Sequence, residues 1–262
     1  MMAVIDVTYD KKTLAPFLMY STPITFKEKI TLYPVSMEHV MEFQGLSKSI
    51  TFRKDSRIGD KKILKMTYLE FLFYAIDHPE LNLLFEDTPD LSKYLQYLFL
   101  LLRLVCPNQE ISFYENTGNL VINGCEITHD EFDDIRRIII LQNGINFDID
   151  EFLNYETEMS LKKAEQKMSQ GADPVTTEDY IDAMCVALHL SEEEIKNMSI
   201  RKFYRIVKRQ KLHEDYTIMR TGEMSGMVKF KQPLKYWIRS TDEDDKYAHL
   251  KADEGELRSK MG

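Results

Sequence analysis

The chain has 262 residues, of which 44% are hydrophobic and 29% are charged, with only 10 glycines and 8 prolines. This length and composition predict one large globular domain or two smaller ones, and they argue against a collagen-like chain or a long disordered linker. The formal net charge of −9 argues against a protein that binds nucleic acid or an anionic membrane through its overall field.

The first 35 residues are predicted to be extended. Ile24, Phe26, Ile30 and Leu32 alternate with polar residues. A period of two is typical of half-buried strands. We therefore expect one or two strands near the N-terminus.

Helices and one loop are predicted from Ser36 onward. Ser36 reads as the N-cap of a short helix, and the polar residues 48–62 read as an exposed loop. Residues 66–76 are apolar on nearly every face, which predicts a helix at the centre of a core, and a second buried helix is predicted from about residue 91 to residue 106. The most apolar stretch, Tyr94–Cys106, is shorter than the roughly 20 residues of a membrane span, so no membrane segment is predicted.

A β-hairpin and a capped helix are predicted in the middle of the chain. Residues 116–119 (NTGN) form a turn signal between two alternating segments. Thr128 and Glu131 form a capping box, and Asn143-Gly144 is a typical helix end. Further along, Ser191 with Glu194 predicts a short capped helix, and a long helix is expected to start at Ser199.

Together these elements predict a mainly α fold of the α+β class. We expect four parts: residues 1–147 as a helical core with strands and a hairpin, 148–174 as a polar connecting helix and linker, 175–240 as a smaller helical domain, and 241–262 as a polar tail. The boundary is placed at the helix-breaking sequence GADP, residues 171–174.

Enzyme and metal signatures are missing from the sequence. It contains no glycine-rich nucleotide motif, no GxSxG and no HExxH, and its six histidines are scattered singly. Cys106, Cys125 and Cys185 form no CxxC pair and have apolar neighbours, which predicts three small core residues in a reducing compartment. We therefore expect a non-enzymatic protein with neither cofactor nor metal.

A basic helix face is the first candidate binding feature. Arg201, Arg205 and Arg209 recur on one face of the helix predicted from Ser199. With the preceding short helix, this face is compatible with a helix-turn-helix that enters a DNA groove. It is also compatible with a solvated or protein-facing surface, which the negative net charge favours. The acidic residues Asp242–Asp245 are a possible partner for the face within the chain.

Large apolar residues near the C-terminus are the second candidate. An aromatic cluster beside a polar tail is typical of a docking surface. The alternative is that Trp237, the only tryptophan, closes a small second core. The candidate contacts are Met224, Met227, Phe230, Tyr236 and Trp237.

Several of these segments together resemble a known protein class. They are residues 29–43, the helix MTYLEFLFYAI, the hairpin and helix ISFYENTGNLVINGCEITHDEFDDIRRIIILQN, the segment LSEEEIKNMSIRKFYRIVKR, and the MSGMVKF and YWI stretches. In this order they are similar to tail proteins of long-tailed bacteriophages of Gram-positive bacteria, and most similar to tail assembly chaperones. The resemblance extends from Lys29 to Trp237 and rests on hydrophobic and capping positions.

The resemblance implies a protein of the host bacterial cytoplasm that binds the phage tape measure protein or tail tube subunits during tail assembly. The five apolar candidates then act as contacts, with Arg201, Arg205 and Arg209 as an electrostatic rim. Two alternatives remain: a structural tail or head–tail subunit of the virion, and a DNA-binding regulator that uses the basic helix 199–211. Self-association also stays open.

Overall fold

The computed structural model describes residues 9–55, 57–85, 90–114, 116–150, 156, 159–160, 163, 175–226, 229–230 and 233–238. The chain divides into two compact units. Unit 1 comprises Met1–Thr157 together with Thr176–Tyr204, and unit 2 comprises Glu158–Val175 together with Arg205–Gly262. Most of the predicted linker 148–174 and all of the predicted tail 241–262 lie outside the described residues.

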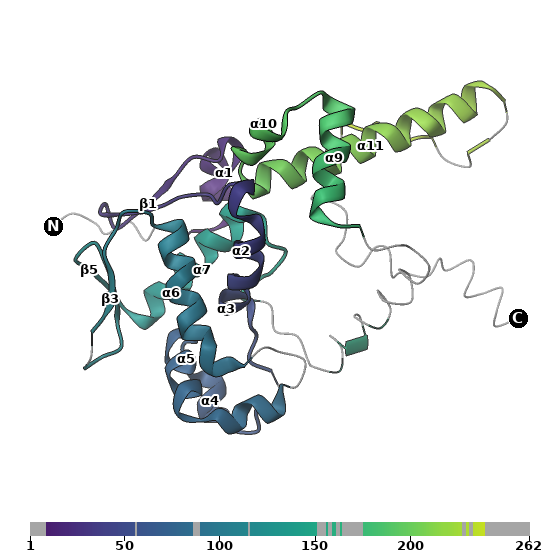
Figure 1. The fold of residues 1–262 in the computed structure, drawn as a ribbon. Helices are drawn as coiled ribbons and strands as arrows, with labels where there is room; N and C mark the ends of the chain where they lie inside the picture. Colours follow the sequence, from purple (N-terminus) through teal and green to yellow (C-terminus); the bar gives the residue numbers. More distant parts are fainter. Residues whose placement is uncertain are drawn as a thin grey trace, which may run out of the picture. The chain divides into compact units, whose positions relative to one another are not determined.

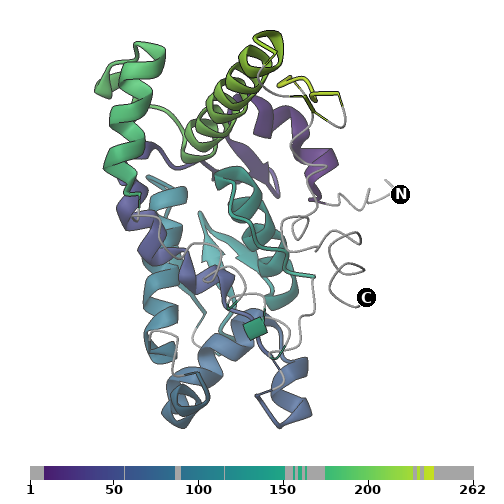
Figure 2. The ribbon, with the colours of Figure 1, turned by 90° about the vertical axis from the view of Figure 1, so that its right-hand side faces the viewer.

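Helices dominate the described structure, and two small antiparallel sheets accompany them (Figures 1 and 2). This confirms the predicted mainly α fold. The described elements in chain order are α1 (Lys11–Tyr20), β1 (Ile24–Phe26), β2 (Ile30–Leu32), η1 (Met37–His39), α2 (Val40–Leu46), α3 (Lys48–Thr51), α4 (Lys61–Lys65), α5 (Tyr68–Asp77), η2 (Pro79–Leu84), η3 (Leu91–Lys93), α6 (Tyr94–Val105), β3 (Ile111–Phe113), β4 (Leu120–Ile122), β5 (Cys125–Ile127), α7 (His129–Asn143), α9 (Thr177–Leu188), α10 (Glu192–Lys196) and α11 (Ile200–Met224).

The core of unit 1 is built on α5, α6 and α7. Helix α5 contacts both α6 and α7, and α6 also contacts α2, α3 and β3 (Figure 1). The two apolar helices predicted from the sequence are therefore surrounded by other elements. Their fully buried side chains include Leu69, Phe71, Leu72, Leu98, Leu101 and Leu102. Within the described part of the chain, no helix combines the length and apolar character needed to cross a bilayer.

The two sheets form where turn-forming residues interrupt apolar segments. Strands β1 and β2 pair with Ile24 opposite Leu32, as the alternation of apolar residues predicts. Strands β3, β4 and β5 form an antiparallel meander. Gly118 and Gly124 have positive φ in its two turns, a conformation that glycine adopts without a steric cost. The predicted hairpin is confirmed.

Capping boxes begin four of the described helices. The pairs Thr67/Glu70, Thr128/Glu131, Thr176/Asp179 and Ser191/Glu194 each exchange side-chain and backbone hydrogen bonds, at the starts of α5, α7, α9 and α10. Such pairs satisfy amide groups that have no partner inside the helix. At the other end of α7, Gly144 is the left-handed C-cap, as predicted.

Two local predictions are wrong. Residues 11–20 form α1 rather than an extended segment, because Asp10 caps the helix and Leu14 and Leu18 are buried on one side of it. Residues 48–62 are not an exposed loop. They contain α3 and the start of α4, and Ile50, Phe52 and Ile58 are buried. These three apolar side chains anchor the polar segment in the core.

The cysteine prediction is confirmed only for Cys106. This residue is buried, and burial raises the pKa of its thiol to about 12. Cys125 and Cys185 are only partly buried.

Residues 176–204, which the sequence analysis assigns to a separate domain, cluster with unit 1 in the structure. Met37 N donates to Met198 O (2.8 Å), and Ile200 N donates to Val35 O (2.9 Å). Ile195, Ile200 and Phe203 are buried. Backbone pairing and apolar packing thus tie this segment to the N-terminal part of the chain.

Candidate partner-binding surface

The second half of α11 provides the frame of the candidate surface. The helix continues from unit 1 into unit 2 and ends at Met224. Gln210 Nε2 donates to Glu214 Oε1 (2.9 Å) four residues on, and the hydroxyls of Thr217 and Thr221 donate to carbonyls one turn earlier (2.8 Å each). These local bonds satisfy polar side chains along the helix.

Residues 233–238 lie along this half of α11. Arg209 Nη1 donates to Trp237 O at 2.8 Å, and the Trp237 ring meets the His213 ring edge-on at 4.9 Å. The rings of Tyr216 and Tyr236 are 5.4 Å apart in the same T-shaped geometry. Edge-to-face pairs are favourable beyond their burial alone. One arginine and four aromatic rings therefore hold the segment on the helix.

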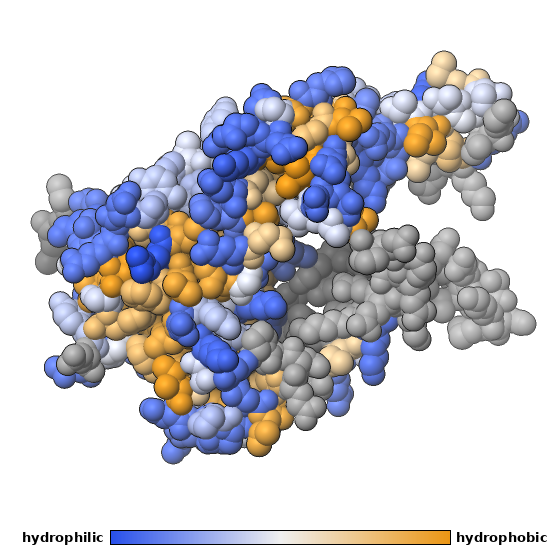
Figure 3. Space-filling view, viewed as in Figure 1, coloured by the Kyte–Doolittle hydropathy of each residue, from blue (hydrophilic) through white to orange (hydrophobic). Residues whose placement is uncertain are grey.

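The described residues of unit 2 bury their apolar side chains poorly. None of them is fully buried, and Trp237 itself is only half-buried. The side chains of Ile218 and Met224 are 71% and 77% exposed, and Met219, Phe230 and Ile238 are exposed as well. Figure 3 shows apolar side chains on the surface of the second half of α11. Isolated exposed apolar residues are normal, but a run of them along a helix is typical of a binding face.

The structure brings together three of the residues predicted as contacts. Tyr236, Trp237 and Arg209 meet on α11, and Tyr236 remains exposed. Met224 and Phe230 are also exposed. Met227 lies outside the described residues. The partner-binding role of all these residues stays a prediction.

Arg201 has a different setting from the other two predicted arginines. It belongs to unit 1, where its Nη1 donates to Leu18 O at 2.6 Å, beside the C-terminal end of α1. Its Cγ also packs so closely on Gly144 that a Cβ there would approach it to 3.1 Å. Arg201 thus contributes to the packing of unit 1.

Ile218 and Met219 are absent from the contacts predicted from the sequence, as are the ring partners His213 and Tyr216. Leu212, Tyr216 and Met219 recur at helical spacing, which places them on one face of α11. That signal is present in the sequence. The pairing of His213 with Trp237 requires the three-dimensional path of residues 233–238, which no local pattern encodes.

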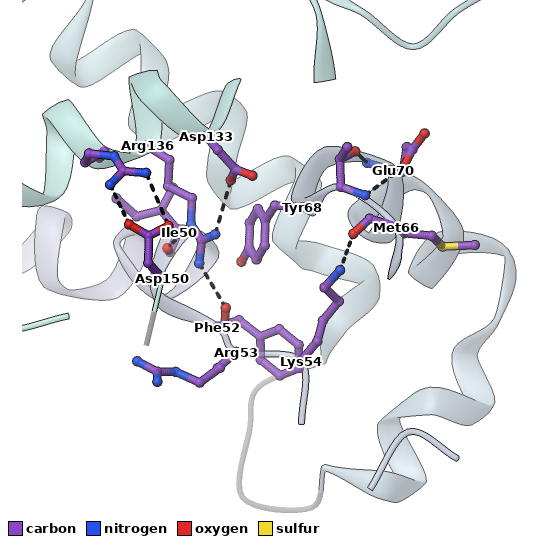
Figure 4. Close-up of polar contacts among 12 residues, drawn as sticks. Ile50, Phe52, Arg53, Lys54, Met66, Tyr68, Glu70, Asp133, Arg136 and Asp150 are labelled. Atoms are coloured by element: carbon purple, nitrogen blue, oxygen red, sulfur yellow. Dashed lines mark hydrogen bonds and ion pairs between the residues drawn. The ribbon is translucent and has the colours of Figure 1, made fainter. Parts of the chain in front are cut away.

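A buried cationic centre is the most developed polar arrangement in unit 1 (Figure 4). Arg136 on α7 donates to Ile50 O (2.5 Å) and Phe52 O (3.1 Å) and pairs with Asp133 (3.3 Å). Its guanidinium lies 3.7 Å from the Tyr68 ring centroid. Every one of these partners is a carbonyl, a carboxylate or an aromatic face that satisfies a cation.

Tyr68 and Lys54 extend this centre. Tyr68 Oη donates to Ser49 O (2.8 Å), and burial raises the pKa of its phenol. Lys54 Nζ donates to Leu64 O (3.1 Å) and to Met66 O, and burial lowers the pKa of its ammonium group (Figure 4). The bonds join α3, α4, α5 and α7, which indicates that the centre stabilises the fold. Among the described residues, no three His, Cys, Asp or Glu side chains gather as metal ligands would.

Part of the chain matches a known protein family. Residues 163–242 match the model of a family described as the YomV second domain, a phage-type family. The match points to a phage-associated protein. It covers less than half of the chain, and within it lie α9, α10, α11 and the segment 233–238, so the candidate surface is inside the matched range. Neither the curated proteins nor the solved structures contain a match to this chain.

Proposed function

We propose that this protein is a non-enzymatic phage tail assembly chaperone that binds apolar helical segments of the tape measure protein, or tail tube subunits. The binding site is the partner surface, defined as Ile218, Met219, Met224, Phe230, Tyr236 and Ile238. The observation that carries the proposal is the exposure of these apolar side chains on the second half of α11, on the segment packed against it, and at Phe230, which lies between the two in the chain.

Physical chemistry favours a protein partner for such a surface. Most of the stability of a helix in a protein comes from burying its apolar face. No described side chain of α11 from Arg205 onward is fully buried. An apolar partner helix could therefore cover much apolar surface there. Methionines adapt to partners of different shape, and aromatic side chains supply large contact area. A chaperone that holds successive apolar stripes of a long helical protein needs this adaptability.

Two further observations support this reading. The family match spans the partner surface and is of phage type. The similarity to tail assembly chaperones extends over the same α10 and α11 segments. A role in tail assembly accounts for both observations and for the exposed apolar surface.

The decisive experiment measures binding of the purified full chain to purified helical segments of the tape measure protein of the same phage. The test variant is Ile218→Asp/Met219→Asp, which places two carboxylates in the surface. Burying an unpaired carboxylate is costly, so affinity is expected to fall by at least about tenfold. The matched control is Leu83→Asp, because Leu83 in η2 has a similar exposure of 77% and lies in unit 1.

Equal binding by both variants would overturn the proposed site, and no binding by the unaltered chain to tape measure or tail tube protein would overturn the function. Quantifying the chain in purified virions separates the alternatives. A chaperone is expected to be absent or substoichiometric there. A fixed stoichiometric copy number would instead establish a structural tail or head–tail subunit.

A further inference from the structure

The part of α11 that belongs to unit 2 carries a regular repeat on one face. Its members are separated alternately by four and three residues, which is the spacing of a coiled-coil seam. Val207 is half-buried, Ile218 is 71% exposed, and the other members are exposed as well. We call this set the seam of α11, and it consists of Val207, Lys211, Glu214, Ile218 and Thr221.

The seam lies on the side of α11 away from residues 233–238. That segment contacts Arg209, His213 and Tyr216. Each of these three residues is two positions from a member of the seam, and two positions along an α-helix are about 200° around its axis. The segment therefore packs on one face of the helix, and the seam is on the opposite face.

Two opposite charges occupy the middle of the seam. Lys211 and Glu214 lie between the apolar residues Val207 and Ile218. In a parallel, in-register pair of such helices, each charge would face the same charge of the other helix, which is unfavourable. In an antiparallel pair with its two-fold axis midway between Lys211 and Glu214, each lysine faces a glutamate. The same axis places Val207 of each helix opposite Ile218 of the other.

We propose that the seam binds the seam of a second copy of this chain in an antiparallel helix pair, with Lys211 of each copy facing Glu214 of the other. Charge complementarity favours this occupant, because a single two-fold axis matches both charges and both apolar residues. Charged residues within a seam also fix the register of a helix pair. The paired length from Val207 to Ile218 is about 17 Å, so we expect a reversible dimer. This inference goes beyond the proposed function and does not depend on it.

Sedimentation equilibrium of the full-length chain tests for the dimer. We expect the mass to rise with concentration from 30.9 kDa toward twice that value. Lys211→Glu and Glu214→Lys each place like charges opposite one another, so each is expected to weaken self-association at least about tenfold. Lys235→Glu is the matched control, because it makes the same charge change at an exposed residue of the segment on the opposite face. This control is expected to self-associate like the unaltered chain.

An equimolar mixture of the two seam variants gives a second readout. In a dimer of Lys211→Glu with Glu214→Lys, both cross-chain pairs again join opposite charges, so the mixture is expected to recover the association that each variant loses alone. Glu214→Lys also lowers the net negative charge, so its weaker association cannot result from overall repulsion.

Three outcomes would overturn the proposal: a monomer at every concentration, equal association of the unaltered chain and both seam variants, or no recovery in the mixture. Ile218 is shared with the partner surface, but neither Lys211→Glu nor Glu214→Lys changes a residue of that surface. A failure of the dimer therefore leaves the test of tape measure binding intact.

Discussion

Arg136 is the side chain on which several elements of unit 1 converge. It extends from α7 to two carbonyls at the end of α3, and its guanidinium stacks on Tyr68 of α5. The residue is only 6% exposed. A buried cation is stable only when its donors are satisfied, and removal of one partner leaves the others buried without a bond. The contacts of Arg136 therefore matter more to folding than those of any neighbouring surface cation.

Replacement of Arg136 by alanine is expected to lower the free energy of unfolding by about 3 kcal/mol, since the carbonyls of Ile50 and Phe52 lose their donor inside the core. Urea unfolding measures the loss. Arg137→Ala is the matched control: Arg137 pairs with Asp150, whose side chain is 66% exposed, so its loss is expected to cost less than about 1 kcal/mol. Equal effects of the two substitutions would contradict the assigned role of Arg136.

At the scale of single elements, the capping box of α5 offers a direct test. Thr67 Oγ1 accepts from Glu70 N (3.3 Å), and the Glu70 carboxylate accepts from Thr67 N (2.7 Å). Thr67→Ala is expected to destabilise the protein by about 1 kcal/mol. Ser36→Ala is the control, because the Ser36 side chain makes no cap hydrogen bond to η1. A loss of similar size from both variants in urea unfolding would count against the capping bond.

The same box has a defined pH dependence. The hydrogen bond from Thr67 N, followed by other bonds, lowers the pKa of Glu70 below its ordinary value of 4.5. A lowered carboxyl pKa stabilises the native state above the unfolded value, and this contribution is lost as pH falls through the native value. Stability is therefore expected to fall with acid below about pH 4.5, and Glu70→Gln is expected to lose less over this range than the unaltered chain.

Local signals explain which elements were predictable. The capping boxes at Thr128 and Ser191, the turn at residues 116–119 and the helix end at Gly144 depend on neighbours in sequence, and all appear where they were predicted. Helix α1 contains Pro16 and was missed, because burial of Leu14 and Leu18 outweighs the weak local helix signal. Residues 48–62 were mispredicted as an exposed loop for the same reason, because burial of their few apolar side chains outweighs their polar composition.

The candidate surface shows the same division between local and tertiary information. Exposure of Met224, Phe230 and Tyr236 follows from their position in a polar C-terminal region. The different settings of Arg201 and Arg209 do not follow from helical spacing, which places them on similar faces. Arg201 is fixed by Leu18, a residue 183 positions away, and such a partner is invisible to sequence patterns.

At the scale of the whole molecule, the position of residues 176–204 decides how the chain divides. Ser36 and Ser199 form a backbone bridge, and Ser21 and Ser199 share a hydrogen bond between their hydroxyls (2.7 Å). Ile195, Ile200 and Phe203 are buried, and each such side chain contributes about 1.5–3 kcal/mol. Unit 1 therefore needs this segment for its stability, although more than 140 residues of sequence separate it from its partners around Val35.

Two truncated chains test this dependence by thermal unfolding. A chain of residues 1–204 retains all of unit 1 and is expected to unfold cooperatively, with a Tm within a few degrees of the corresponding transition of the full chain. A chain of residues 1–157 lacks Ile195, Ile200 and Phe203 and exposes the surface around Val35 and Met37, so its Tm is expected to fall by more than about 10 °C. Equal stability of the two truncated chains would instead support a division into an independent core at 1–147 and a separate domain at 175–240.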